Sequence, residues 1–220
     1  MTDKINKALD ELNCILPLVK NQNDLSPEDA RVHITILNSY AMQGREPSLN
    51  ELAGLSNNIS ATLANLQKLD LVVLNDDGKI RGAYPFTSED RIHQVTIDQH
   101  TVHCMCALDS LAVSPMFQMP THIRSKCVVS GADIDIRQNL DRVLNADDNH
   151  EVYFAIDWGA ANGNLSCADS LCGYMDFIKG DSLAKEWQEK SKDYEAFNID
   201  EAIEFASRFF SPLIQSRRAA

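Results

Sequence analysis

The sequence predicts an α+β fold, in which an N-terminal, winged-helix-like helical domain precedes a mixed or antiparallel β-sheet core with flanking helices. Two observations lead to this prediction. Apolar residues up to about residue 70 recur at helical spacing, whereas the chain beyond residue 92 contains short alternating segments typical of strands. With 220 residues, of which 44% are hydrophobic, the chain is long enough to bury a substantial core. We expect an N-terminal helix within residues 1–24, the winged-helix-like domain over 25–88 and the larger α+β domain over 89–220.

The first two helices are predicted from apolar spacing and capping signals. Residues 5–16 carry isoleucine and leucine at helical spacing, and the pattern ends at Pro17. Polar residues 21–24 are expected to form a link. Ser26 is typical of a helix N-cap, because a proline and two acidic residues follow it where the first turn would be. The second helix should therefore run from there to about Met42.

A short helix, a longer helix and a β-hairpin are predicted next. Ser48 and Glu51 have the spacing of a capping box, which predicts a helix that ends near Leu55. Another helix is expected over 59–70. Two strands, 71–74 and 79–84, would follow, joined by the turn 75–78. This order of elements is that of a winged helix.

The charge of this region argues against DNA binding. Residues 28–85 contain five basic and seven acidic side chains, and the presumed recognition helix, 59–70, has one lysine and no arginine. A DNA-binding protein needs several cationic contacts to phosphates. We therefore expect a packing or substrate-covering role for the winged-helix-like domain, with no nucleic acid as partner.

The second half alternates short strands with helices. Strands are predicted at 93–97, 126–129, 132–136, 152–157 and 173–178, and helices at 106–113, 182–191 and 200–209. The mainly local connections between these elements favour the α+β class.

The overall charge and hydropathy indicate a cytoplasmic protein. The net charge of −12 and the pI near 4.8 disfavour nonspecific attraction to DNA or to anionic lipid. No apolar run approaches the roughly 18 residues that cross a bilayer, and the first residues lack the basic and then apolar pattern of a signal peptide. We expect no membrane partner.

Six cysteines are the unusual feature of the composition: Cys14, Cys104, Cys106, Cys127, Cys167 and Cys172. In a reducing cytosol, cysteines are more often thiols or metal ligands than disulfides. A structural zinc site is one alternative, because four thiolate or imidazole ligands close a tetrahedral site. However, the sequence has no C-x-x-C pair, and the spacings of 104 to 106 and of 167 to 172 are not those of zinc fingers or ribbons.

Cys106 and Asp109 form the densest chemical signal. If a helix begins near Cys106, the two residues are three apart and share a face, so a thiolate and a carboxyl proton donor could meet one reacting atom. The amides at the helix start are expected to lower the pKa of this thiol. The alternative is that Cys106 is a small buried hydrophobic residue and Asp109 an ordinary acid of a first helical turn. Cys172, at the entrance of a predicted strand, could face either a pocket or the core.

Three blocks of this sequence resemble the alkylmercury (organomercurial) lyases, in the same order and at similar spacing. They are Cys-Ala-Leu-Asp-Ser-Leu at 106–111, Lys-Cys-Val-Val-Ser-Gly at 126–131 and Ser-Leu-Cys-Gly-Tyr-Met-Asp-Phe at 170–177, the last followed by Glu-Trp at 186–187. The resemblance also covers the winged-helix-like half. Two positions differ from the family pattern: Gly173 stands where the best-known members have a second cysteine, and Met105, preceded by Cys104, stands where they have an aromatic residue.

The resemblance implies an enzyme that cleaves the carbon–mercury bond of alkyl or aryl mercurials by protonolysis, with residues 89–220 as its catalytic domain. Cys106, Asp109 and Cys172 would be the catalytic set and would hold mercury as substrate and product, whereas Cys127 would be structural. Thiolates suit mercury because both are soft, and Asp109 would deliver the proton. An apolar environment would have to raise the pKa of this carboxyl, and Leu108, Leu111 and Val113 could supply it.

The resemblance also implies which partners are needed. No organic cofactor is expected; cellular thiols would be required for turnover, and a mercuric reductase could accept the Hg(II) product. Two alternatives stay open at the level of sequence. One is a thiol-based soft-metal-binding protein of the same fold without lyase activity, and the other is a metal-responsive winged-helix regulator.

Overall fold

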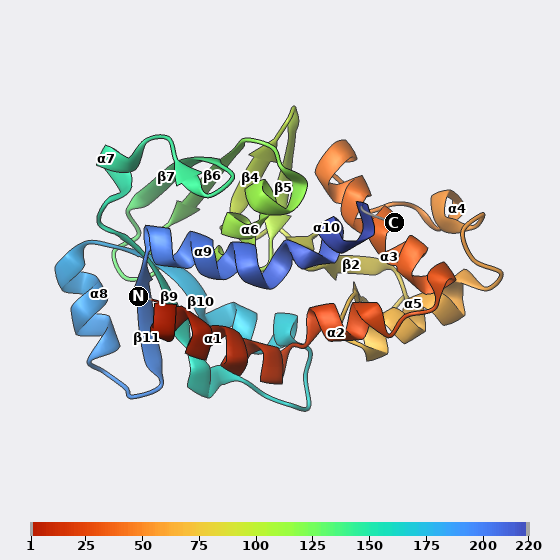
Figure 1. Cartoon of the computed structure of the whole chain (residues 1–220), viewed down its shortest axis with the longest axis horizontal. Helices are drawn as coiled ribbons and strands as arrows, with labels where there is room; N and C mark the ends of the chain where they lie inside the picture. Colours follow the sequence, from red (N-terminus) through yellow and green to blue (C-terminus); the bar gives the residue numbers. More distant parts are fainter. Residues whose placement is uncertain (1, 219–220) are drawn as a thin grey trace.

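Two antiparallel sheets enclose a central pair of helices in the computed structural model, which describes residues 2–218 (Figure 1). The helices are α6 (Ala107–Phe117) and α9 (Ile199–Phe210), which lie against each other. Both helices contact strands of both sheets, and α9 also contacts α1. This arrangement confirms the predicted α+β class with an antiparallel sheet and flanking helices.

The larger sheet has eight strands in the order β1-β2-β3-β5-β4-β6-β7-β8. Their bounds are β1 Val73–Leu74, β2 Ile80–Ala83, β3 Phe86–Thr87, β4 Gln94–Ile97, β5 His100–Cys104, β6 Thr121–Lys126, β7 Asp133–Asn139 and β8 Arg142–Val143. The smaller sheet, in the order β10-β9-β11, consists of β9 Val152–Asp157, β10 Met175–Lys179 and β11 Tyr194–Asn198. Strand β9 pairs with both neighbours, so that Phe154 lies opposite Phe177 on one side and Phe197 on the other.

The N-terminal helices begin where the capping signals predict. They are α1 Thr2–Ile15, α2 Leu18–Asn23, α3 Pro27–Gln43, α4 Leu49–Leu52 and α5 Ile59–Lys68. The Ser26 side chain accepts a hydrogen bond from the amide of Asp29, and Ser48 and Glu51 form the expected capping box at the start of α4. Gly44 caps the C-terminus of α3 with a φ of 72°, a left-handed conformation that glycine adopts without strain.

Residues 21–24 were expected to be a polar link, and this prediction is wrong. Three of these four residues complete a helical turn in α2, because Gln22 is fully buried and its side chain donates a hydrogen bond to the carbonyl of Leu213 on α10 (Pro212–Arg218). Tertiary contact with a distant helix therefore decides the local structure of a segment whose composition favours a loop.

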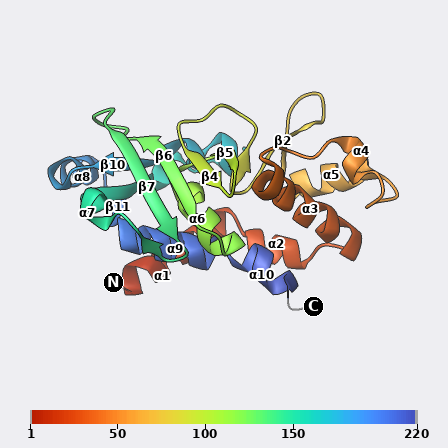
Figure 2. The same cartoon turned by 90° about the horizontal axis from the view of Figure 1, so that it is seen from above.

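The larger sheet contains strands from both sides of residue 88, the predicted boundary between the winged-helix-like domain and the α+β domain. Strand β3 pairs with β2 on one side and with β5 on the other, so the hairpin of the N-terminal region and the strands of the second half share one sheet. Figure 2 shows α3, α4 and α5 at one end of the molecule and the long strands β6 and β7 toward the other. The division into units at residues 24 and 88 stays a prediction, and residues 1, 219 and 220 of those units lie outside the described part of the chain.

Two strand predictions in the second half need correction. Residues 127–129 were expected to continue a strand, but β6 ends at Lys126 and the chain turns, with the amide of Gly131 bonded to the carbonyl of Cys127. The strand predicted at 173–178 begins only at Met175, because Gly173 and Tyr174 belong to a 3₁₀ turn, η3 (Leu171–Tyr174), immediately before β10. Pattern alone predicted neither β11 nor α10.

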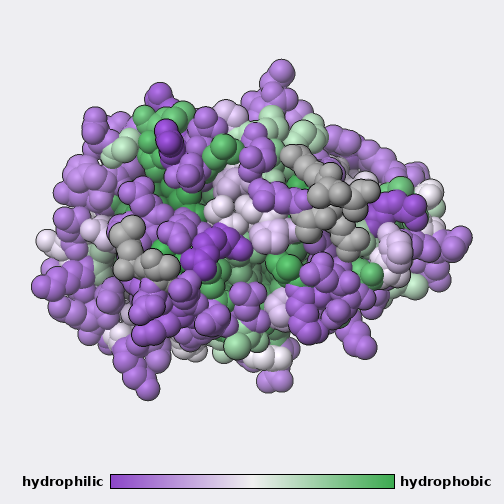
Figure 3. All heavy atoms as spheres, in the orientation of Figure 1, coloured by the Kyte–Doolittle hydropathy of each residue, from purple (hydrophilic) through white to green (hydrophobic). Residues whose placement is uncertain are grey.

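The remaining elements complete the surface of the molecule. They are α7 Ala146–Asn149, α8 Asp181–Gln188 and the 3₁₀ turns η1 Trp158–Ala160 and η2 Cys167–Asp169. Most of the face seen in Figure 3 is hydrophilic, with smaller hydrophobic areas between. Among residues 2–218, no helix is long and apolar enough to cross a membrane.

Candidate functional site

The first turn of α6 places a cysteine and an aspartate together inside the molecule. Cys106 is the N-cap of this helix, and its Sγ accepts a hydrogen bond of 3.4 Å from the backbone amide of Asp109. All eleven residues of α6 are buried, so the helix starts in the protein interior rather than in solvent. The predicted helix start and the shared face of Cys106 and Asp109 are both present.

The η3 turn brings Cys172 to the same place. One ligand atom from each of Cys106, Asp109 and Cys172 lies within 4.8 Å of the other two. The Cys106 thiol also donates to the thioether sulfur of Met175, 3.6 Å away, at the start of β10. In the part of the chain that the structure describes, these three residues are the one group of three or more cysteine, histidine or carboxylate side chains that could hold a metal ion.

Burial and hydrogen bonds within the cluster raise the pKa values of the two thiols. Cys106 is 1% and Cys172 5% exposed. Desolvation, together with the nearby carboxyl of Asp109, raises the pKa of Cys106 to about 12. The pKa of Cys172 also lies well above its ordinary value, because it shares hydrogen bonds with Cys106 and Cys167 and is buried. The expectation that helix-start amides lower the thiol pKa is therefore wrong, since the cost of burying a thiolate exceeds the contribution of one amide.

Asp109 is a buried carboxyl group without a hydrogen-bond partner. Neither of its carboxylate oxygens has a partner among the described residues, and only 1% of the residue is exposed. Desolvation raises the pKa of Asp109 to about 7, while contacts with Cys106 pull it in the opposite direction. Leu108 and Leu111, which are both fully buried, belong to the apolar surroundings that were expected to raise this pKa. At neutral pH the carboxyl can therefore both hold and release a proton.

Cys127 lies away from this cluster, at a junction between the two sheets. The amide of Val128 donates to the carbonyl of Phe177 on β10, and the Cys127 Sγ accepts hydrogen bonds from the amides of Ser130 and Lys179. Cys14 is exposed on α1. The structure therefore separates these two cysteines from the three residues that meet at the start of α6.

A fourth buried side chain, Cys167, reaches the cluster, and sequence reasoning left it unassigned. Its Sγ lies 3.6 Å from the Sγ of Cys172. The signal in the sequence was the five-residue spacing between the two cysteines, which fits no standard metal motif but suits two successive 3₁₀ turns, η2 and η3. Met175 was missed as well, because a methionine at the start of a strand is usually a core residue.

The comparisons with known proteins agree with the resemblance found in the sequence. The family model described as "MerB: Alkylmercury lyase" matches residues 86–211. A protein named alkylmercury lyase from Staphylococcus epidermidis is 24% identical over 139 residues, which are 63% of this chain and 62% of that protein. Another, from Bacillus cereus, is 21% identical over 154 residues, which are 70% of this chain and 69% of that protein.

A solved structure shares the fold of the chain. The structure titled as the mercury-bound form of MerB2 superimposes with a TM-score of 0.71 at 18% sequence identity, over 90% of this chain and 98% of that one.

Proposed function

Because the chain belongs to the alkylmercury lyase family, we propose that it cleaves the carbon–mercury bond of organomercurials by protonolysis, releasing a hydrocarbon and Hg(II). The observation that carries this proposal is the buried meeting of two thiols and one unpartnered carboxyl group. Two thiols can hold a soft metal, and the carboxyl can supply the proton that carbon needs.

The reaction starts with exchange of thiol ligands on mercury. Cys106 or Cys172 attacks the mercury of R–Hg–SR′ and displaces the thiolate R′S⁻, while Asp109 takes up the proton of the attacking thiol. The pKa of Cys106, about 12, means that this thiol is protonated before mercury arrives. Metal binding drives the loss of its proton, as it does for thiol ligands in general.

Protonolysis follows when the second thiol adds to mercury. Its proton goes to the displaced thiolate and gives R′SH. Higher coordination then increases the electron density on carbon, and Asp109 donates its proton to carbon as the carbon–mercury bond breaks. Hydrocarbon leaves, Hg(II) stays on the two sulfurs, and Asp109 is ionised again. The pKa of Asp109, about 7, allows this cycle at neutral pH.

The other features of the chain have supporting roles in this proposal. External thiols, or a mercuric reductase, would remove Hg(II), and no organic cofactor is required. A thiol-dependent reaction also fits a reducing compartment such as the cytoplasm. Cys127 would be structural, since its sulfur accepts hydrogen bonds where the two sheets meet.

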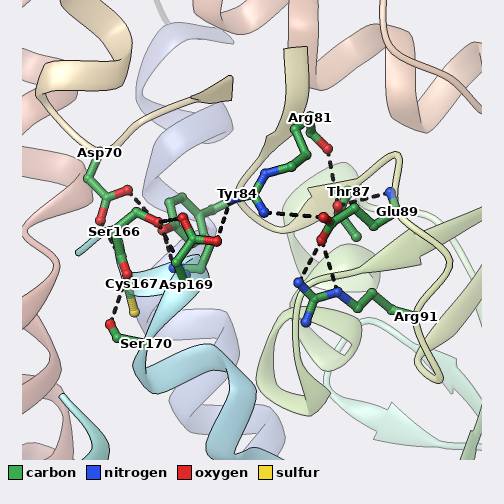
Figure 4. Close-up of polar contacts among 11 residues, drawn as sticks. Asp70, Arg81, Tyr84, Thr87, Glu89, Arg91, Ser166, Cys167, Asp169 and Ser170 are labelled. Atoms are coloured by element: carbon green, nitrogen blue, oxygen red, sulfur yellow. Dashed lines mark hydrogen bonds and ion pairs between the residues drawn. The ribbon is translucent and has the colours of Figure 1, made fainter. Parts of the chain in front are cut away.

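The N-terminal region would cover the site rather than bind DNA. We assign α3, α4, α5 and the β1–β2 hairpin to a winged-helix-like unit, supported by the contact between α3 and α5 and by the tight turn at 75–78. Its buried Tyr84 and its half-buried Asp70 accept hydrogen bonds from the η2 turn, next to the turn that carries Cys172 (Figure 4).

The experiment is a hydrocarbon assay. Purified protein is incubated with phenylmercuric acetate and excess thiol, and benzene is measured against a control that contains thiol alone. We expect benzene above the control for the natural protein and for Cys14→Ser, and none for Asp109→Asn. Tight mercury uptake without benzene would instead identify a soft-metal-binding protein, and benzene formation that survives Asp109→Asn would refute the proton-donor role.

A further inference from the structure

The mechanism proposed above leaves one thiol of the buried cluster without a role. Cys167 lies on η2 with its Sγ 3.6 Å from that of Cys172, and the two residues are 3% and 5% exposed. Two thiols at this distance form a dithiol that can hold one soft metal ion with only small movements. Cys172 therefore has a possible metal-binding partner on each side, Cys106 and Cys167.

Two side chains of the N-terminal region, buried Tyr84 and half-buried Asp70, fix the position of Cys167. Its backbone amide donates to Oδ2 of Asp70 at 2.9 Å, and the amide of Ala168 donates to the hydroxyl of Tyr84 at the same distance. The Tyr84 hydroxyl in turn donates to Oδ1 of Asp70, so one carboxylate holds both donors (Figure 4). A turn held by three linked hydrogen bonds does not need to be ordered when metal binds.

A second group of contacts holds the same turn at its surface end. Ser166 caps η2 by accepting from the amide of Asp169, and the Asp169 carboxylate pairs with Arg81, which also pairs with Glu89 (Figure 4). The salt bridges are partly exposed, so their contribution is to orientation more than to stability.

Cys167 also borders the outside of the molecule. It lines a surface pocket of about 700 Å³, together with Asp70, Ser166 and Ser170. Ser170 precedes η3 directly, so the pocket reaches the turn that carries Cys172. Of the three thiols Cys106, Cys167 and Cys172, Cys167 is the one that lines this pocket, although only 3% of the residue is exposed.

We propose that Cys167 is the exit ligand for Hg(II): it takes the metal ion from the Cys106–Cys172 pair and presents it, bound to Cys167 and Cys172, to an external thiol in the pocket. This inference rests on the proposed function for the origin of the metal ion. In the exchange, the Cys167 sulfur forms a bond to mercury, the Cys106–mercury bond breaks, and the proton of Cys167 passes to the Cys106 thiolate. No electrons change hands, and Cys106 is returned as a thiol for the next substrate.

Removal of Cys106 isolates the proposed exit pair, and the test needs only Hg(II). In a Cys14→Ser background, which removes the exposed thiol, Cys106→Ser keeps an N-cap oxygen at the start of α6. The reduced proteins receive one equivalent of HgCl₂ and are dialysed against glutathione, and retained mercury is measured by atomic absorption. Circular dichroism verifies that each variant is folded.

We expect Cys106→Ser to retain mercury on Cys167 and Cys172, and the added change Cys167→Ser to weaken retention roughly 100-fold or more. Cys104→Ser, added in place of Cys167→Ser, is the matched control, because Cys104 is also a buried thiol close in sequence to Cys106. The control should retain mercury. Equal retention with and without Cys167, or loss on removal of Cys104 alone, would overturn the assignment.

The outcome is separate from that of the lyase proposal. Because Hg(II) is added directly, the retention test gives the same reading whether or not the protein forms benzene. If benzene forms, Cys167→Ser should slow repeated turnover at limiting thiol more than it slows the first turnover. A first turnover that is slowed to the same extent would contradict a role in product exit.

Discussion

Cys106 and Cys127 stand at turns of similar local geometry but have opposite acid–base behaviour. Each sulfur accepts a 3.4 Å hydrogen bond from the backbone amide three residues further along the chain, from Asp109 and from Ser130. The pKa of Cys106 is nevertheless raised to about 12, whereas that of Cys127 is lowered. A cysteine at a turn is therefore not automatically a reactive thiolate.

The difference comes from what surrounds each sulfur. Burial raises the pKa at both sites. At Cys127 the side chain of Ser130 and the amides of Lys179, Ser130 and Val129 outweigh this effect, because all of them favour the charged form. At Cys106 a hydrogen bond with Cys172 and one backbone amide lower the pKa, but burial and the adjacent carboxyl of Asp109 outweigh them. The first site suits a fixed structural contact, and the second keeps a proton until a metal ion replaces it.

The largest expected effect is on turnover when a cluster thiol is removed. Cys106→Ser and Cys172→Ser should each lower the rate of hydrocarbon formation roughly 1,000-fold or more, because each variant keeps only one of the two thiols that meet Asp109, and mercury is then no longer held by both sulfurs beside the proton donor. Cys14→Ser should keep a near-natural rate, as this residue is exposed. Gas chromatography of benzene gives the rates. Substantial turnover by Cys106→Ser would contradict the assignment of Cys106 to the reacting site.

The next effect is on stability as a function of pH. Asp109 has a pKa raised to about 7 in the folded protein, so between about pH 4 and 7 the folded state binds more protons than the unfolded state. The free energy of unfolding should fall as pH rises through this window, by at most on the order of 4 kcal/mol from this group.

Asp109→Asn provides the matched control for that prediction. The amide does not ionise, so the decrease in stability attributed to Asp109 should be missing from the variant when urea unfolding is compared at pH 5 and pH 8. Equal pH dependence of the two proteins would mean that Asp109 is ionised at pH 5 and so is not the proton donor.

A smaller change in stability is expected when Cys127 is replaced. Cys127→Ala removes the acceptor for the amides of Ser130 and Lys179 and should lower the free energy of unfolding by about 1–3 kcal/mol. The folded fraction should still form benzene, because Cys127 lies outside the cluster. Loss of protonolysis in a fully folded Cys127→Ala protein would show that the two sites are not independent.

The smallest expected effect is on the pKa of Cys127 when the hydroxyl of Ser130 is removed. Ser130→Ala removes one group that stabilises the Cys127 thiolate, so the pKa of Cys127 should rise while that of Cys106 stays unchanged. Ultraviolet thiolate absorbance during a pH titration measures both, with Cys127→Ala used to assign the signal. An unchanged titration would mean that the backbone amides alone lower the Cys127 pKa.

Local signals in the sequence predicted the elements that depend on local contacts. Ser26, Ser48 and Glu51 mark helix starts because a cap is satisfied within one turn. By contrast, the predictions for the segments that contain Gln22 and Val128 were wrong. Gln22 is ordered by a distant helix, and Val128, in an apolar run, is exposed because the chain turns after β6.

The three residues of the cluster were predicted from the sequence, but the direction of the thiol pKa shift was not. The three-residue spacing placed Cys106 and Asp109 on one helical turn, and the family resemblance added Cys172. The sign of the thiol pKa shift was wrong, because a sequence does not show that the first turn of α6 faces the interior. Cys167 escaped prediction since its contact with Cys172 depends on two successive 3₁₀ turns held by Asp70 and Tyr84.

A single-turnover experiment without external thiol shows whether Cys106, Asp109 and Cys172 together cleave the carbon–mercury bond. Protein in excess over phenylmercuric acetate should release one benzene per mercury added, and all the mercury should remain on the protein. In Asp109→Asn, the mercury should remain bound with its phenyl group attached, as mass spectrometry of the intact protein would show. Mercury that stays bound as phenylmercury on the natural protein would contradict the account, because two thiols and a carboxyl group would then bind the substrate without cleaving it.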